Sequence, residues 1–136
     1  MKKPGYDNSV RLIYELENEV FSPGAEFKDH EQAQGYVNEI LGSRFWKDNP
    51  ALPSNVVVYD NGDNNYSECR GRNQIWIAKT QLNQMVALHE LAHFYPPADG
   101  HGPKFITAYL GLVAQFMGIH FSDQYRRAFV AHGIKF

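Results

Sequence analysis

The chain has 136 residues, of which 43% are hydrophobic and 14% are aromatic, a composition that excludes a disordered chain and predicts a single domain, 1–136. Its 13 Lys and Arg residues nearly balance its 15 Asp and Glu residues, which argues against a nucleic-acid partner. No apolar run approaches the roughly 20 residues of a membrane span and no apolar segment follows the N-terminal lysines, so we expect a cytoplasmic protein without a membrane partner.

The first part of the chain is expected to form two amphipathic helices. Apolar residues recur at helical spacing over residues 9–21, where Ser9 can serve as the N-cap and a Ser-Pro-Gly turn ends the helix. A second helix is expected over residues 30–41, with Asp29 as its N-cap and Gly42 at its end.

A small antiparallel sheet is expected next. The β-branched run VVVYD, residues 56–60, is typical of a strand, and the segment NGDNN after it is typical of a hairpin turn. A segment around YSEC and the run NQIWIA, residues 73–78, would complete the sheet. The alternation of side chains then places Ile75 and Ile77 on one face and Trp76 on the other.

Cys69, Arg70 and Arg72 lie between the last two expected strands. A single cysteine excludes an internal disulfide and fits a reducing compartment, and Cys69 is interpreted as a small buried residue. The two arginines flank Gly71, where a solvated turn is the ordinary interpretation and an anion-binding site is the alternative.

The second part of the chain returns to helical patterns. Residues 81–95 contain no helix breaker, and Thr80 can cap their start. The segment PPADGHG must interrupt the helix, and a largely apolar helix, expected in the core, resumes at Pro103. A last helix is expected over residues 122–133, with Ser122 as its N-cap.

The segment HELAH, residues 89–93, is the most informative motif. His89 and His93 are four residues apart, so an α-helix stacks their imidazoles on one face, where both can bind one zinc ion. Glu90 points to the side of such an ion and can accept a proton from water. The spacing thus separates the metal ligands from a base.

A third histidine follows the turn. Gly100 and Gly102 let the backbone reverse, so His101 can reach the same ion from the start of the next helix. Three protein ligands and one open position are typical of catalytic zinc sites. Asp99 is a competing ligand, although an Asp before Gly in such a turn is more often a local cap. The isolated histidines are interpreted as surface or core residues: His30, His120 and His132.

HELAH followed by a short spacer and HGPKF resembles the signature of SprT-like zinc metalloproteases, including the Spartan type, and is closer still to small metallohydrolases of actinobacteria and their phages. A softer likeness runs through most of the chain, from RLIYELENEVF to RRAFVAHGI. The resemblance implies an α+β, minimal zincin-like (SprT-like) fold, in which a small antiparallel sheet packs against the HExxH helix. It also implies that His89, His93 and His101 bind Zn²⁺ and that Glu90 is the catalytic base.

The implied activity is that of a zinc metallopeptidase, which cleaves a peptide or protein substrate by Glu90-assisted attack of zinc-bound water. The run NQIWIA is a candidate for pairing with an extended substrate, and ordinary sheet interior is the equal alternative. Many SprT-like proteases carry a cysteine-rich zinc ribbon and DNA-binding segments. This chain has one cysteine and no basic tail, so repair of DNA-linked protein is not expected.

Several alternatives stay open at the level of the sequence. Spacing selects no partner for the tetrahedral oxyanion among five candidates: Tyr66, Tyr95, Arg70, Arg72 and His120. A non-catalytic zinc module would need a fourth ligand from Asp99 or Cys69. A binding protein that a phage uses against a host factor, in the host cytoplasm, is a further alternative. The oligomeric state leaves no pattern in the sequence, and we expect a monomer.

Overall fold

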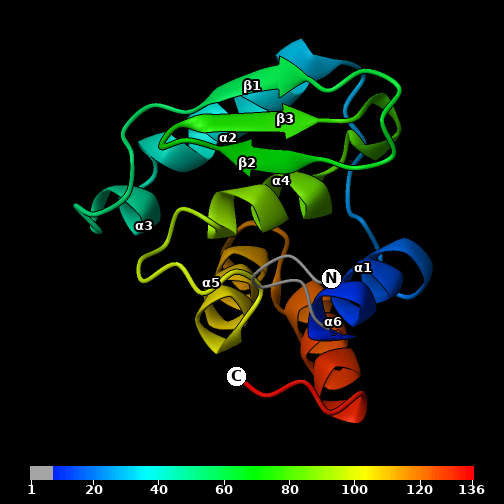
Figure 1. Ribbon diagram of the computed structural model, residues 1–136. Coiled ribbons are helices and arrows are strands. Elements are labelled where there is room, and N and C mark those ends of the chain that lie inside the picture. The colour runs from blue at the N-terminus through cyan, green and yellow to red at the C-terminus, as the bar shows by residue number, and fades with distance from the viewer. Residues whose placement is uncertain (1–7) are drawn as a thin grey trace.

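The structure, a computed structural model, describes residues 8–136 and has an α+β fold, as the sequence predicts (Figure 1). The helices are α1 (Asn8–Glu19), α2 (His30–Gly42), α3 (Arg44–Lys47), the short 3-10 helix η1 (Lys79–Gln81), α4 (Gln84–Ala92), α5 (Pro103–Phe116) and α6 (Ile119–Ala131). The strands are β1 (Val57–Asp60), β2 (Glu68–Arg70) and β3 (Gln74–Ile77). None of the described helices is long and apolar enough to cross a membrane.

The sheet is mixed, so the prediction of a wholly antiparallel sheet is wrong. β3 is the central strand, and its Ile75 lies opposite Val58 of the parallel strand β1 and opposite Cys69 of the antiparallel strand β2. The hairpin turn lies between β2 and β3, where Gly71 has a φ of 60° that glycine adopts freely. The segment NGDNN turns the chain as well, but it carries the chain past β3 to the opposite edge of the sheet.

The two faces of the central strand differ as predicted. Ile75 and Ile77 are fully buried, whereas Trp76 is half-buried and its ring stacks on that of Tyr59, with 4.6 Å between centroids. β2 forms the edge of the sheet nearest α4 in Figure 1, and β1 forms the other edge. The edge strand therefore borders the helix that carries the HELAH motif.

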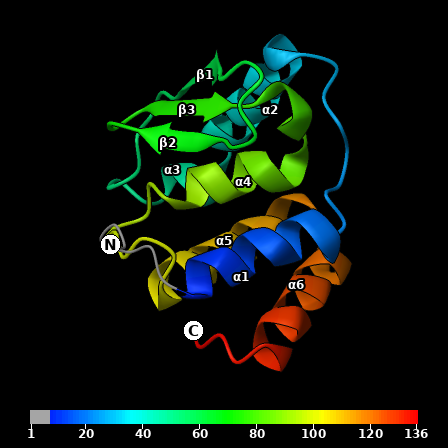
Figure 2. The same ribbon diagram turned by 45° about the vertical axis from the view of Figure 1, so that its right-hand side comes forward.

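α4 lies in the middle of the fold, between the sheet and α5 (Figures 1 and 2). All of its side chains from Met85 to Ala92 are buried. α5 also belongs to the core, as predicted from its apolar sequence, and α6 packs against it. Because α4 is covered on both sides, each polar side chain on it needs a partner inside the protein.

Two of the predicted helix starts are confirmed. At the start of α2 the Asp29 side chain accepts the N–H of Gln32 at 2.9 Å, and Pro103 is in the first turn of α5. α2 ends at Gly42, as predicted. α3 follows directly and was not predicted, because a helix of four residues is too short to produce a recognisable periodicity.

Other predicted helix boundaries are wrong. α1 already includes Asn8, the first described residue, so Ser9 lies inside the helix and is not its N-cap as predicted. Thr80 lies in η1, and α4 is capped instead by Asn83, whose side chain accepts the N–H of Val86 at 2.9 Å. α4 also ends at Ala92, with His93 as its C-cap, rather than at residue 95. Tyr95 precedes Pro96, which disfavours helical backbone at that position.

Ser122 is not the N-cap of the last helix. α6 already begins at Ile119, directly after Gly118, whose φ of 108° permits a tight turn between α5 and α6. Ser122 is buried inside α6, where its hydroxyl donates to the Leu110 carbonyl at 3.4 Å. The Ser122 hydroxyl therefore links α6 to α5 and does not cap α6.

Candidate metal centre

α4 holds two histidines one turn apart, as the spacing predicts. His89 and Glu90 are buried in the helix, and His93 is half-buried at its C-terminal end. The ring centroids of His89 and His93 are 5.2 Å apart. Burial between the sheet and α5 fixes the direction in which these side chains point, so both imidazoles face the bend that follows α4.

The bend brings the third histidine back to α4. Asp99 caps α5, because its carboxylate accepts the N–H groups of Lys104 at 2.8 Å and of Phe105 at 3.0 Å. This confirms the interpretation of Asp99 as a local cap. A Cβ atom at Gly102 would lie 2.7 Å from the Asp99 carboxylate, so this close approach requires glycine. The capped turn thus fixes the position of His101 beside α4.

One ring nitrogen from each of His89, His93 and His101 lies within 4.8 Å of the other two. The Nε2 atoms of His89 and His101 are 3.1 Å apart. A tetrahedral zinc ion with bonds of roughly 2.1 Å holds two nitrogen ligands roughly 3.4 Å apart, so this spacing fits such an ion. The three predicted ligands are therefore close enough to hold a metal ion. No other His, Cys, Asp or Glu of the described residues belongs to this group.

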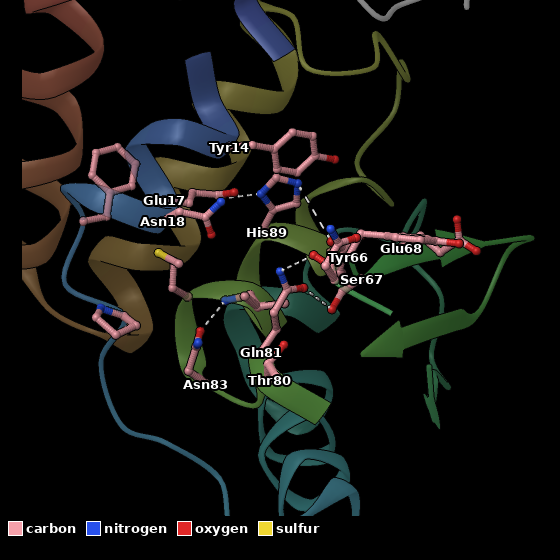
Figure 3. A pocket seen from close by; sticks show the side chains of 16 residues that line it. Tyr14, Glu17, Asn18, Tyr66, Ser67, Glu68, Thr80, Gln81, Asn83 and His89 are labelled. Carbon is pink, nitrogen blue, oxygen red and sulfur yellow. Dashed lines mark hydrogen bonds and ion pairs between the residues drawn. The ribbon is translucent and has the colours of Figure 1, made fainter. Parts of the chain in front are cut away.

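Glu17 of α1 sets the orientation of His89 (Figure 3). Its carboxylate lies 2.5 Å from Nδ1 of His89 and accepts a hydrogen bond of 2.7 Å from the Tyr109 hydroxyl. Glu17 is buried, with 8% of its surface exposed. A carboxylate at Nδ1 keeps a proton there, so Nε2, which faces His101, is the nitrogen that can bind a metal once its own proton is lost.

The charges around the site differ in their effect on the two histidines of α4. Burial lowers the pKa of His89, but the charges of Glu17 and Glu90 outweigh burial and raise this pKa to about 9. Burial, together with the charges of His89 and His101, lowers the pKa of His93 to about 2. His93 is therefore a neutral imidazole ready to bind a metal, while a metal that binds His89 has to displace a proton.

Glu90 is a buried carboxyl group beside the three histidines. Burial, together with the charges of Glu17 and Glu68, raises its pKa to about 7 against the opposing charge of His89. Its Oε2 lies 3.9 Å from Nε2 of His89. A carboxyl group with a pKa near neutrality can both accept and release a proton at neutral pH.

Two adjoining cavities open onto this site. The larger has a volume of about 800 Å³ and reaches His89, and the smaller, of about 260 Å³, reaches His93 and His101. Glu90 and Glu68 line both of them. The larger cavity has the size of a typical ligand site, and Glu90 lines it together with His89.

The strand at the site is β2 rather than β3. Glu68 and Cys69 of β2 line the smaller cavity, and β2 is the edge strand. β3, which contains the run NQIWIA, is hydrogen-bonded on both sides, so it cannot pair with a substrate, and the sheet-interior alternative is the right one. Its Ile75 and Ile77 are typical of a central strand buried on one face.

Cys69 is half-buried rather than fully buried, and it faces the smaller cavity. Burial, followed by the charges of Glu90 and Glu68, raises the pKa of the Cys69 thiol to about 12. Arg70 and Arg72 are exposed at the turn after it, where Arg70 pairs with Glu68. The solvated-turn interpretation of this segment thus matches the exposure of both arginines.

The isolated histidines lie away from the metal ligands, as expected. His30 contacts the Ile77 carbonyl at 2.8 Å, and His120 and His132 are exposed. Among the five residues considered as oxyanion partners, Tyr66 lines the larger cavity. Neither cavity is lined by the other four: Tyr95, Arg70, Arg72 and His120.

Three residues of the site were missed in the sequence: Tyr14, Glu17 and Tyr109. Glu17 follows Ile13 by four residues and therefore lies on the apolar face of α1, where a carboxylate needs a buried partner. The position of Glu17 on this face was the sequence feature that could have identified it. Tyr109 had a weaker feature of this kind, because a hydroxyl inside an apolar helix also needs a partner. No feature of the sequence pointed to Tyr14.

Comparison of the chain with family models, with curated proteins and with solved structures finds no significant match.

Proposed function

We propose that the chain is a zinc-dependent hydrolase that cleaves peptide bonds, with Zn²⁺ bound by His89, His93 and His101 and with Glu90 as the base. The observation that carries the proposal is the convergence of three imidazole nitrogens within 4.8 Å of one another, beside a buried carboxyl group. The likeness of HELAH and HGPKF to SprT-like metalloproteases, the SprT-like fold and the cytoplasmic location stay predictions.

The donor set fits zinc. Imidazole nitrogen is a preferred zinc ligand, and three protein ligands leave the fourth tetrahedral position open, as in catalytic sites. When bound there, zinc acts as a Lewis acid that lowers the pKa of a bound water and polarises a carbonyl group. The short contact between Glu17 and His89 supports the fit, because it directs Nε2 of His89 toward the other two ligands.

Glu90 has the position and the pKa of a proton carrier. In the first step the water oxygen bonds to the carbonyl carbon of the substrate, and Glu90 accepts the proton that the water loses. In the second step the C–N bond breaks, its electron pair moves to nitrogen, and Glu90 returns the proton to the leaving amine. A pKa of about 7 suits both directions of transfer.

Within the described residues no strand pairs with the outer edge of β2, and we propose this edge as the place for the substrate backbone. Glu68 and Cys69 place this strand at the rim of the smaller cavity, and an extended peptide could add to it by main-chain hydrogen bonds. β2 has three residues, so pairing with it spans a short piece of substrate. We therefore expect an unfolded or extended chain as substrate rather than a folded protein.

The test is cleavage of unfolded casein by the zinc-loaded protein and by its Glu90→Gln variant. Glutamine keeps the size and burial of the side chain but cannot accept the proton, so we expect cleavage to be lost while zinc content and thermal unfolding stay close to those of the parent. A Glu90→Gln variant that cleaves casein at the parental rate would refute the role of Glu90.

A second candidate is a non-catalytic zinc module that binds a protein partner. The observation in its favour is that Cys69 lines the same small cavity as His93 and His101. A structural zinc site usually has four protein ligands, and Cys69 would be the fourth. Asp99 no longer competes for this place, because its carboxylate caps α5.

A further inference from the structure

Peptide hydrolysis places a negative charge on the former carbonyl oxygen, and such an oxyanion is usually stabilised by hydrogen-bond donors at its site. An oxyanion forms only if the chain is a hydrolase, so the assignment of its donor rests on the proposed function. We look for a donor that faces all three histidines and Glu90, of which His89 lines the larger cavity, His93 and His101 line the smaller one, and Glu90 lines both. The residues that line both cavities meet this condition: Tyr14, Ser67, Glu68 and Glu90.

Three of these four residues are unsuited to donate. Glu68 and Glu90 carry carboxyl groups, and Glu90 is the proposed base. Ser67 uses its hydroxyl hydrogen on Gln81, at 2.6 Å, and its oxygen accepts the N–H of Ala78 at 2.9 Å. Tyr14 carries a phenol, whose hydroxyl can donate a hydrogen bond.

The ring of Tyr14 lies against two of the three metal ligands. It stacks on His89, with 5.7 Å between centroids and 18° between planes, and meets His101 edge-on at 5.4 Å and 64°. Figure 3 shows Tyr14 beside His89, with its hydroxyl pointing away from α1. Tyr14 lines both cavities, so its side chain borders the space beside the histidines.

The position of Tyr14 is also fixed by Glu17, a second residue of α1. Glu17 follows Tyr14 by three residues, so the two side chains share one face of the helix. The bonds from Glu17 to His89 and to Tyr109 tie this face of α1 to α4 and α5. A donor that is fixed before the reaction costs no reorganisation when the charge develops.

We propose that Tyr14 is a catalytic residue whose hydroxyl donates a hydrogen bond to the oxyanion. As the water oxygen bonds to the carbonyl carbon, the electron pair of the C=O π bond moves to the carbonyl oxygen, and this oxygen accepts the hydrogen bond. Tyr14 keeps its proton throughout, because the water proton goes to Glu90 and then to the amine nitrogen. When the C–N bond breaks, the C=O bond forms again and the hydrogen bond weakens.

The test compares Tyr14→Phe with the parent protein, both loaded with zinc. Phenylalanine keeps the ring that stacks on His89 and removes the hydroxyl alone. We expect kcat for casein-derived peptides to fall about 100- to 1,000-fold, with KM and zinc affinity close to parental values. Tyr59→Phe is the matched control, because Tyr59 stacks on Trp76 and lines neither cavity, and its kcat should stay unchanged.

A binding measurement provides a readout other than turnover. An alanine-based phosphinic peptide carries a tetrahedral anionic group in place of the scissile bond. We expect Tyr14→Phe to bind it about 10- to 100-fold more weakly in calorimetry, as for a lost hydrogen bond to a charged group, and Tyr59→Phe to bind it normally.

The outcomes separate this inference from the proposed function. If the parent cleaves peptides and Tyr14→Phe matches it in kcat and in phosphinate affinity, Tyr14 is not the donor and the hydrolase stands. If Tyr66→Phe shows the loss of kcat instead, Tyr66 of the larger cavity is the donor. If the zinc-loaded parent neither cleaves peptides nor binds the phosphinate, the proposed function and the role of Tyr14 are both refuted.

Discussion

The carboxylate of Glu17 lies 2.5 Å from Nδ1 of His89, although the two residues are 72 positions apart in the sequence. This contact joins the first helix of the described chain to the centre of the HELAH motif. It makes α1 part of the candidate metal site, because the same helix also places Tyr14 against His89.

Replacing Glu17 should weaken zinc binding. In Glu17→Gln the side chain keeps its shape but loses the negative charge that orients His89 and increases its basicity, and we expect zinc affinity to fall about 10- to 100-fold. Competition with a chelating dye measures this change. Glu15→Gln is the control, since Glu15 is exposed on the same helix, and its affinity should equal that of the parent. If Glu17→Gln binds zinc as tightly as Glu15→Gln, Glu17 has no role at the metal.

Loss of His101 should lower the zinc affinity more than loss of Glu17 does. His101→Ala removes one of three ligands, so we expect its zinc affinity to fall further than the roughly 10- to 100-fold change expected for Glu17→Gln. The fold should persist, because His101 is half-buried at the surface of a bend. His120→Ala is the control at an exposed histidine. A zinc affinity unchanged by His101→Ala would mean that the bend does not deliver a ligand.

Cys69→Ser separates the hydrolase from the structural zinc module. If three histidines bind the ion, this variant should keep the zinc affinity and the peptidase activity of the parent. A site with Cys69 as fourth ligand would instead lose affinity, because serine is a poor zinc ligand. Visible absorption of the cobalt-substituted protein gives a second readout, since a thiolate ligand adds a charge-transfer band that histidine ligands lack.

Removing the Asp99 cap should destabilise the bend that carries His101. Asp99→Ala leaves the N–H groups of Lys104 and Phe105 without their acceptor, and we expect a loss of about 1 to 2 kcal/mol in the free energy of unfolding. Urea denaturation measures this loss. Asp63→Ala, at an exposed loop position, should cost less than about 0.5 kcal/mol. Equal stability of the two variants would contradict the capping role.

The sequence predicted that His89, His93 and His101 converge, because their geometry is mostly local. The interval of four residues between His89 and His93 is set by the helical period, and the path to His101 is a short bend after α4. Glu17 could not be assigned in the same way. Its position on an apolar face indicates a buried partner, but the identity of that partner depends on how α1 packs against α4 and α5.

The order of the strands could not be predicted either, because it is decided by contacts between distant segments. NGDNN and the turn at Gly71 both have the composition of a hairpin turn, and only the second one joins neighbouring strands. The helix starts failed for a different reason. Thr80 and Asn83 are both acceptable N-caps, but Thr80 is part of η1 and Asn83 caps α4.

A crystal structure of the zinc-loaded protein tests the central claim most directly. We expect one ion bound by ring nitrogens of His89, His93 and His101 at about 2.0–2.1 Å, with a solvent oxygen in the fourth position. An ion whose fourth ligand is the Cys69 sulfur, or a structure in which His101 faces bulk solvent, would contradict it.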